Sequence, residues 1–215
     1  VGFRDNLAAA ERIISTSVAE GFGMAFLEPW LVQREVVARR LPAVIDDFET
    51  RGVVFEKLYD AIPVPGDASW IKMCEDEYLQ AAMKAWAPLP RQFRPSIRGP
   101  HSSSSDTVDF ARLTPSRQID VLNRCHRDPG YENELKQRSE KVCRSLTEPA
   151  DTAVIGLNHS VVAERYSTDS TGRVLVSIYD EIIRGDVSSE IESPPHGEQS
   201  VDLIADAKPY FPCRT

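Results

Sequence analysis

The sequence contains one match to a motif in which lysine activates a serine nucleophile. Ser69 and Lys72 have the S-x-x-K spacing, in which a lysine one helical turn away can take the proton of a serine. The companion K-T-G motif is absent from the chain, and loose patterns of this length recur by chance. We therefore expect Ser69, or Asp67 beside it, to cap a helix.

Cysteine and histidine supply a second group of reactive side chains, at Cys125 and His126, with Cys143 further along. Neighbouring residues of a helix point about 100° apart, which prevents this thiol and imidazole from sharing one metal ion or acting as nucleophile and base. We expect Cys125 and Cys143 to face each other as small apolar groups. The remaining histidines have no partner at the spacing of metal ligands: His101, His159 and His196. We predict no catalytic residue, no metal site and no cofactor.

Two glycines flank Phe22 in a short Gly-Phe-Gly segment. A dinucleotide-binding loop needs a third glycine, a strand before it and a helix after it. The third glycine is missing, and the residues before Gly21 have the spacing of a helix rather than a strand. The sequence therefore predicts no nucleotide site here, and we expect Gly21 and Gly23 to end a helix.

Arginine is concentrated in the middle of the chain. Residues 91–144 contain nine arginines and two lysines, with Phe93, Phe110 and Tyr131 nearby. Arginine combined with aromatic side chains is typical of proteins that hold single-stranded nucleic acid, by phosphate pairing and base stacking. The formal charge of the whole chain is −8, so these arginines can equally pair with acidic segments of the chain or with an acidic neighbour. Both alternatives stay open.

Composition places the chain among ordinary globular proteins, with 41% hydrophobic and 27% charged residues in a length of 215. Its longest apolar stretches, such as residues 153–157, are far shorter than the roughly 20 residues of a membrane-spanning helix. Four cysteines without a C-x-x-C pair predict reduced thiols. We expect no membrane span, and a reducing compartment or a virion rather than secretion.

Helical spacing of apolar residues dominates the first 90 positions. Steps of three and four from residue 7 to residue 18 predict a helix that ends near Gly21. Further helices are expected after Pro29, after Pro42 and over residues 55–62. The clearest pattern lies over residues 68–87, where two adjacent apolar rows predict a helix covered on more than one side.

The second half of the chain changes character twice. Residues 91–108 are rich in proline, arginine and serine and are predicted to form a linker. Thr114 is a favourable N-cap residue, and Pro115 is favourable at the first position of a helix. They begin a predicted helical hairpin that runs to about residue 146. After Pro149, runs of β-branched residues over 152–157, 160–166 and 173–179 predict strands.

These elements together predict an α+β fold. It comprises an N-terminal helical bundle over residues 1–90, the linker over 91–108, and a third part over 109–215. That third part is expected to hold the helical hairpin, a small mainly antiparallel C-terminal sheet and an extended C-terminal arm.

The absence of a catalytic motif and the extended segments together favour a non-enzymatic structural or interaction subunit of a large ordered assembly. A viral capsid surface component and a subunit of an organellar complex both fit this description, with other protein subunits as the partners. Extended arms often gain order on a partner's surface. The partner-binding residues that we predict lie in the linker and the arm: Arg91, Arg94, Arg98, Tyr210 and Phe211.

Two alternatives belong to other functional classes. The first is an RNA or single-stranded nucleic-acid binding protein that uses the arginine-rich segment 91–144. The second is a hydrolase with an unrecognised site around Cys125, His126 or Ser69.

Overall fold

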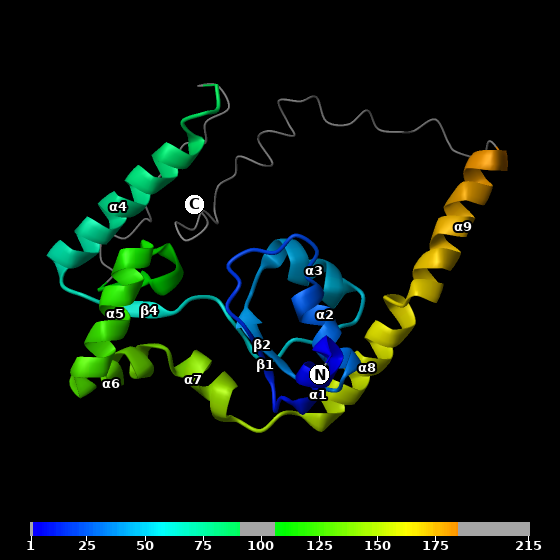
Figure 1. Cartoon of the computed structure of the whole chain (residues 1–215), viewed down its shortest axis with the longest axis horizontal. Coiled ribbons are helices and arrows are strands. Elements are labelled where there is room, and N and C mark those ends of the chain that lie inside the picture. Colours follow the sequence, from blue (N-terminus) through cyan, green and yellow to red (C-terminus); the bar gives the residue numbers. More distant parts are fainter. Residues whose placement is uncertain (1, 91–105, 185–215) are drawn as a thin grey trace. The chain divides into compact units, whose positions relative to one another are not determined.

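The computed structural model describes residues 2–90 and 106–184 (Figure 1). Within these ranges the chain forms two compact units. The first unit contains residues 2–60 and 141–184, and the second contains residues 61–90 and 106–140. The first unit is therefore assembled from two stretches that are far apart in the sequence.

Three short parallel strands form the centre of the first unit. They are β1 (Ile13–Ser15), β2 (Val36–Arg39) and β3 (Leu58–Tyr59), which pair in the order β1-β2-β3. Parallel strands need crossover connections, which are provided by α2 (Met24–Leu31) between β1 and β2 and by α3 (Pro42–Thr50) between β2 and β3. Every residue of the central strand β2 is buried, as is usual in parallel sheets.

The core of the first unit lies between this sheet and its helices. Phe26 and Trp30 of α2 are almost completely buried, and Ile45 of α3 is fully buried. Phe55 meets the rings of Phe26 and Trp30 edge to face, each at a centroid distance of 6.1 Å. Edge-to-face pairs of this kind add to the stabilisation from apolar burial.

The remaining helices of the first unit are α1 (Phe3–Ala9), α7 (Glu140–Thr147), α8 (Thr152–Arg165) and α9 (Thr168–Arg184). Val162 of α8 belongs to the same core as α2. The fully buried side chain of Asn158 accepts a hydrogen bond from the Val54 amide at 2.8 Å and donates one to its carbonyl at 2.7 Å. These contacts attach α8 to the N-terminal half of the unit.

A buried ion pair makes a second attachment. The Lys57 ammonium lies 3.5 Å from a carboxylate oxygen of Glu35 and donates to the carbonyls of Glu148 and Pro149 at 3.0 and 2.9 Å. Both charged side chains are more than nine-tenths buried. Burial raises the pKa of Glu35 above its ordinary value of 4.5, and the Lys57 charge opposes that rise.

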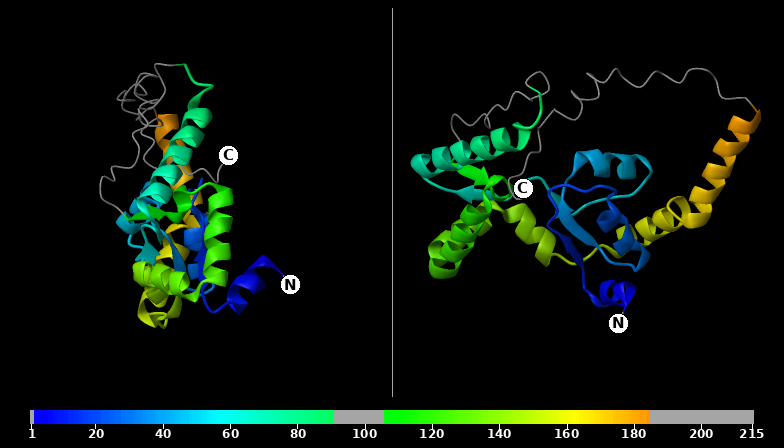
Figure 2. Two further views of the ribbon diagram at one scale, coloured as in Figure 1. Left: turned by 90° about the vertical axis from the view of Figure 1, so that its left-hand side faces the viewer. Right: turned by 45° about the horizontal axis from the view of Figure 1, so that its top comes forward.

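The second unit consists of helices around a two-stranded ribbon (Figure 2). β4 (Pro63–Pro65) pairs antiparallel with β5 (Thr107–Asp109). The helices are α4 (Ala68–Trp86), the 3₁₀ helix η2 (Phe110–Arg112), α5 (Pro115–Arg127) and α6 (Pro129–Arg138). Val64, Ile71, Leu113 and Val121 lie in its core with Tyr131, whose hydroxyl donates to the Pro65 carbonyl at 3.4 Å.

The predicted small antiparallel sheet after Pro149 is wrong, because the residues assigned to it lie in helices α8 and α9. Asp151 caps α8 by accepting hydrogen bonds from the amides of Ala153 and Val154 at 2.7 and 3.3 Å. The β-branched residues of α8 also recur at helical spacing, and burial of Val162 against α2 outweighs their preference for strands.

The predicted N-terminal helical bundle is also wrong, since residues 13–15, 36–39 and 58–59 form the parallel sheet. Strands of two to four residues are too short to show a clear alternation of apolar and polar residues. The central strand β2 has no such alternation, because all four of its residues are buried. Two helix predictions are confirmed. α4 occupies residues 68–86 of the predicted 68–87, and α5 begins at Pro115 behind the N-cap Thr114.

Replacing Lys57 by methionine removes the partner of the buried Glu35 carboxylate, and we expect a loss of about 3–5 kcal/mol in the free energy of unfolding at pH 7. Without Lys57 the pKa of Glu35 rises further. The folded state then binds a proton that the unfolded state releases, so the loss shrinks as the pH falls toward the ordinary value of 4.5. Urea denaturation at pH 7 and pH 5 measures both effects.

The control for this substitution is the double variant Lys57→Met with Glu35→Leu, in which neither charge remains. We expect it to recover most of the loss at pH 7 and to lose the added pH dependence. A Lys57→Met loss that is equal at both pH values would contradict the role assigned to Glu35.

Candidate functional site

The carboxyl ends of the three parallel strands lie at one edge of the sheet, and the loop from β1 to α2 leaves from this edge. That loop covers residues 16–23 and ends in Gly21, Phe22 and Gly23. A strand therefore does precede the Gly-Phe-Gly segment, and the sequence-based expectation that these glycines end a helix is wrong. The signal that could have found the strand is the β-branched content of residues 13–18.

Gly23 fits its position only because it has no side chain. Its φ angle is 70°, in the left-handed region, and an added Cβ would lie 2.2 Å from Cγ1 of Val44 and 2.9 Å from the Phe48 ring. By contrast, a Cβ at Gly21 would meet no atom within 4 Å, and the Phe22 side chain is 90% exposed. The loop is thus packed against α3 on one side and open on the other.

Gly23 is the N-cap of α2 and supplies no side-chain hydrogen bond to the first turn. In most helices a serine, threonine or aspartate oxygen accepts from these amides. Asp67 does so in α4, by accepting from the amides of Ser69 and Trp70, both at 2.9 Å. In the first turn of α2 the Phe26 amide donates to the Gly23 carbonyl at 2.9 Å, and the amides of Met24 and Ala25 receive no side-chain cap from Gly23. They lie at the positive end of the helix dipole, where an anion is stabilised.

Arginines at the end of β2 hold this edge of the sheet together. The buried Arg39 donates to the Asp60 carbonyl, and its guanidinium lies 5.6 Å from the centre of the Tyr59 ring. Arg40 binds both carboxylate oxygens of Glu49, at 2.8 and 2.7 Å. This hydrogen-bonded pair lowers the pKa of Glu49 and raises that of Arg40. Both arginines therefore have structural partners in the same unit.

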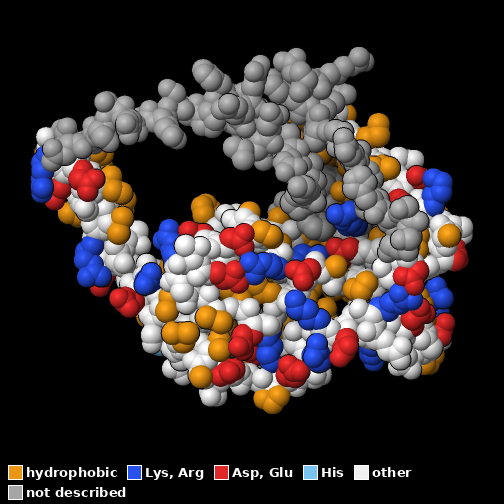
Figure 3. Space-filling view, turned by 180° about the vertical axis from the view of Figure 1, so that it is seen from behind, with side chains coloured by type: hydrophobic (Ala, Val, Ile, Leu, Met, Phe, Trp, Pro, Cys, Tyr) orange, Lys and Arg blue, Asp and Glu red, His pale blue; other side chains and the backbone are white. Residues whose placement is uncertain are grey.

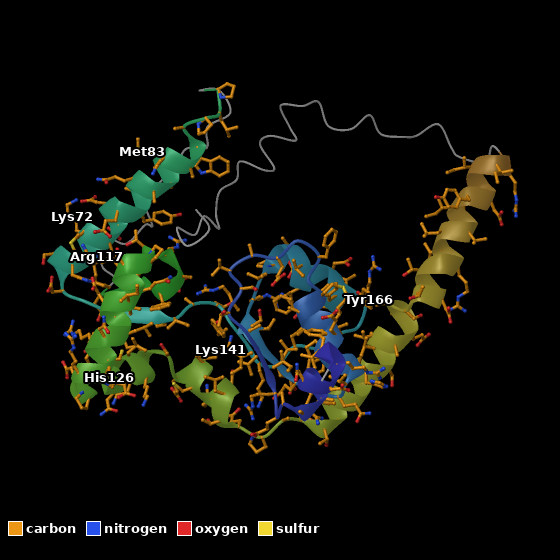
Figure 4. All side chains as sticks on the ribbon, viewed as in Figure 1. Lys72, Met83, Arg117, His126, Lys141 and Tyr166 are labelled. Carbon is orange, nitrogen blue, oxygen red and sulfur yellow. The ribbon has the colours of Figure 1, made fainter. Side chains whose placement is uncertain are left out.

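The S-x-x-K pair has no geometry for catalysis. The Ser69 hydroxyl donates to the Asp67 carboxylate at 2.5 Å, within the N-cap of α4. The Lys72 ammonium lies 3.1 Å from a carboxylate oxygen of Asp76, one turn further along the same helix (Figure 4). Of the two residues expected to cap this helix, Asp67 is confirmed as the N-cap, whereas Ser69 lies inside the first turn of α4.

The described cysteines are free thiols. Cys125 lies on α5 of the second unit with His126 beside it, whereas Cys143 lies on α7 of the first unit. Burial raises the pKa of the Cys125 thiol, and burial also raises that of Cys74 on α4 to about 11. Thiols with raised pKa values are poor nucleophiles at neutral pH.

The histidines considered from the sequence do not come together as metal ligands. Nδ1 of His159 lies 3.0 Å from the Trp30 carbonyl oxygen, inside the first unit. His101 and His196 lie outside the described residues. Among the described residues, no three histidine, cysteine or acidic side chains are grouped so that they could hold a metal ion.

Four arginines of the segment 91–144 bind acidic or aromatic side chains of their own unit. The pairs are Arg112 over Tyr78 (5.4 Å), Arg117 with Glu77 (2.7 Å), Arg124 over Tyr131 (3.8 Å) and Arg138 with Asp106 (2.6 Å). Figure 4 shows Arg117 on α5 beside α4. These contacts match the alternative in which the arginines pair within the chain.

The residues predicted to bind partners are not placed by the structure. Arg91, Arg94, Arg98, Tyr210 and Phe211 all lie outside residues 2–90 and 106–184. Among the residues that are described, no helix is both long enough and apolar enough to cross a membrane.

Comparisons with protein-family models, with curated proteins and with solved structures find no match for this chain. The geometry of the carboxyl edge of the parallel sheet is therefore what makes this edge the candidate functional site. This edge has backbone amide donors, and its loop is exposed at Gly21 and Phe22. The described side chains that were considered there do not form a pair of nucleophile and base.

Because the pKa of Cys74 is about 11, its thiolate fraction at pH 8 is on the order of 0.1%. We expect iodoacetamide at pH 8 to leave Cys74 largely unmodified in the native protein and to modify it fully in denaturant. Peptide mass spectrometry after timed quenching follows Cys74 and Cys125 separately. Rapid labelling of Cys74 in the native state would contradict its raised pKa, and rapid labelling of Cys125 would support the hydrolase alternative.

Proposed function

We propose that this chain binds a phosphate-bearing ligand of the nucleotide class at the carboxyl edge of its parallel sheet. The observation that carries the proposal is the glycine-containing loop between β1 and α2, which leads directly into the uncapped N-terminus of α2. The site would act by binding, with the backbone amides of the loop and the first helical turn as donors.

The connectivity of the parallel sheet supports this function. A β-α-β-α-β unit with sequential strand order is one mononucleotide-binding half of a doubly wound sheet, whose ligand lies outside the carboxyl ends of the strands where the strand order reverses. The described strands form one such half without a reversal, so the support comes from the connectivity alone. The order β1-β2-β3, with α2 and α3 as crossovers, has this connectivity. A phosphate at the start of α2 would meet amide donors and the positive end of the helix dipole.

The loop departs from the dinucleotide pattern in two respects. It has two glycines in place of three, and Arg40 stands after β2, where an acidic residue commonly binds a ribose. Arg40 is already paired with Glu49 and Asp46. These departures favour a mononucleotide or a nucleoside diphosphate derivative over NAD.

Substituting Phe22 tests this site without disturbing the core, because the side chain is 90% exposed. Phe22→Asp places a carboxylate next to the proposed phosphate position, whereas Phe22→Asn has nearly the same shape and no charge. We expect the Asp variant to bind at least tenfold more weakly than the Asn variant, a difference of about 1.4 kcal/mol. Isothermal titration calorimetry with ADP, GDP, UDP and inorganic pyrophosphate measures it.

Equal affinities of the two variants would place any bound nucleotide elsewhere on the chain. Failure of all four probes to bind the unsubstituted protein at millimolar concentration would contradict the proposed function itself.

A second candidate function is the assembly subunit predicted from the sequence. One observation favours it: helix α9 exposes several large apolar side chains, and contiguous exposed apolar patches commonly mark interaction surfaces. The nucleic-acid alternative, which uses the arginine-rich segment 91–144, stays a prediction. The paired arginines of the second unit give it no added support.

If linker and arm lock subunits together, deleting residues 206–215 or replacing Arg91, Arg94 and Arg98 by glutamate should abolish assembly and leave the isolated fold intact. Light scattering after size exclusion, at physiological salt and on material from the native source, gives the mass. Circular dichroism reports the fold. A particle mass that neither change alters would contradict this function.

A further inference from the structure

Helix α8 contains a modification motif in its middle. Asn158, His159 and Ser160 form the triplet N-x-S, in which an asparagine accepts an N-linked glycan. It is the one N-x-S or N-x-T triplet of the chain. Because short patterns recur by chance, the surroundings of the asparagine decide what this triplet can do.

The side chain of Asn158 is inaccessible to a modifying enzyme in the folded chain. Its exposed fraction is 0%. Nδ2, the atom that would carry the sugar, donates to the Val54 carbonyl at 2.7 Å, and Oδ1 accepts from the Val54 amide at 2.8 Å. A glycan is bulky and hydrophilic and needs an acceptor at the surface. Both polar ends of Asn158 are thus used inside the fold.

Apolar side chains lie beside this acceptor. Val162, one helical turn beyond Asn158, and Val53, next to Val54, are each 2% exposed and belong to the core of the first unit. Protein interiors are packed as densely as organic crystals, with few voids larger than a water molecule. A sugar ring on Nδ2 would therefore separate α8 from the loop between α3 and β3.

The helical conformation of the triplet also separates its two functional groups. Residues two apart in a helix point about 200° from one another, so the amide of Asn158 faces the core while Ser160 is exposed. The Ser160 hydroxyl donates to the Gly156 carbonyl at 3.1 Å within α8. A transferase that must reach the asparagine amide and the serine hydroxyl together cannot do so on this helix.

We infer that Asn158 accepts an N-linked glycan only before the first unit folds, and that this modification and the folded unit exclude each other. In the transfer, C1 of the sugar bonds to Nδ2, which gives up one proton. The bond from C1 to the pyrophosphate oxygen of the lipid carrier breaks, and the lipid pyrophosphate is the leaving group. The inference goes beyond the nucleotide site and does not depend on it.

The consequence for folding follows from what Asn158 attaches. Its hydrogen bonds join residues that are 104 positions apart, and Val162 packs in the same core as α2. With a glycan on Nδ2 these contacts cannot form, so α8 stays off α2 and leaves its apolar side chains in water. The glycosylated chain therefore cannot complete the first unit.

The purified full chain tests the first half of the inference. It is incubated with a single-subunit eukaryotic oligosaccharyltransferase and a lipid-linked chitobiose donor, alongside a synthetic peptide of residues 152–165. We expect the peptide to be glycosylated. Asn158 of the folded chain should react on the order of 100-fold more slowly, because the reaction requires local unfolding of α8. Intact mass and peptide mass spectrometry measure both rates.

Arg165→Asn is the matched control on the same helix. It creates a second triplet with Ser167 at the exposed end of α8. Charged side chains of both signs lie at the surface where α8 leads into α9 (Figure 3). We expect the folded variant to be glycosylated at position 165 and not at Asn158. The contrast separates the accessibility of the acceptor from the activity of the enzyme.

Expression of the full chain behind a secretion signal in cultured cells tests the second half, because the transferase there meets the chain before it folds. The control is Ser160→Ala, which removes the triplet and alters only an exposed side chain. We expect the glycosylated chain to be digested at a trypsin concentration roughly tenfold below the one that cleaves the Ser160→Ala chain.

Two results would overturn the inference. One is glycosylation of Asn158 in the folded Arg165→Asn variant at the same rate as the new site. The other is a glycosylated chain that resists trypsin as well as the Ser160→Ala chain does. Nucleotide affinity enters neither experiment, so either result leaves the proposed function separately tested.

Discussion

The buried ammonium of Lys57 joins parts of the first unit that are separated by 91 and 92 residues in the sequence. A charge without water requires both a counter-ion and hydrogen-bond partners. Glu35 supplies the first, and the carbonyls of Glu148 and Pro149 supply the second. The start of β2, the approach to β3 and the connection from α7 to α8 must therefore meet at one place.

This closure has consequences for the candidate site. With the α7–α8 connection held at the sheet, α8 packs against α2 through Val162 and fixes the helix whose N-terminus follows Gly23. The same glycine lies against Val44 and Phe48 of α3. The loop is thus packed against α3 at Gly23, while the neighbouring Phe22 side chain is exposed. The sheet thus positions the β1–α2 loop and the N-terminus of α2, and it does not supply reactive side chains.

Part of the candidate site was visible in the sequence, and part was not. The Gly21-Phe22-Gly23 segment can be read from the sequence, but the spacing of residues 7–18 predicts a helix where the structure has strand β1. Three residues of strand cannot outweigh such a pattern. β1 forms because Ile13 pairs with Val36 of β2, and local spacing does not report that distant partner. The same reason explains why α8 was predicted as strands.

The sequence by itself determined where several helices begin. Asp67 and the Thr114-Pro115 pair act on amides within their own first turn, so their effect can be read from neighbouring residues. Only the tertiary structure decided that short β-branched runs become parallel strands in one place and helix α8 in another. The partners that make this choice are remote: Val36 for Ile13, and Val54 for Asn158, 104 residues away. Burial and hydrogen bonding at those contacts outweigh the local preference of the chain.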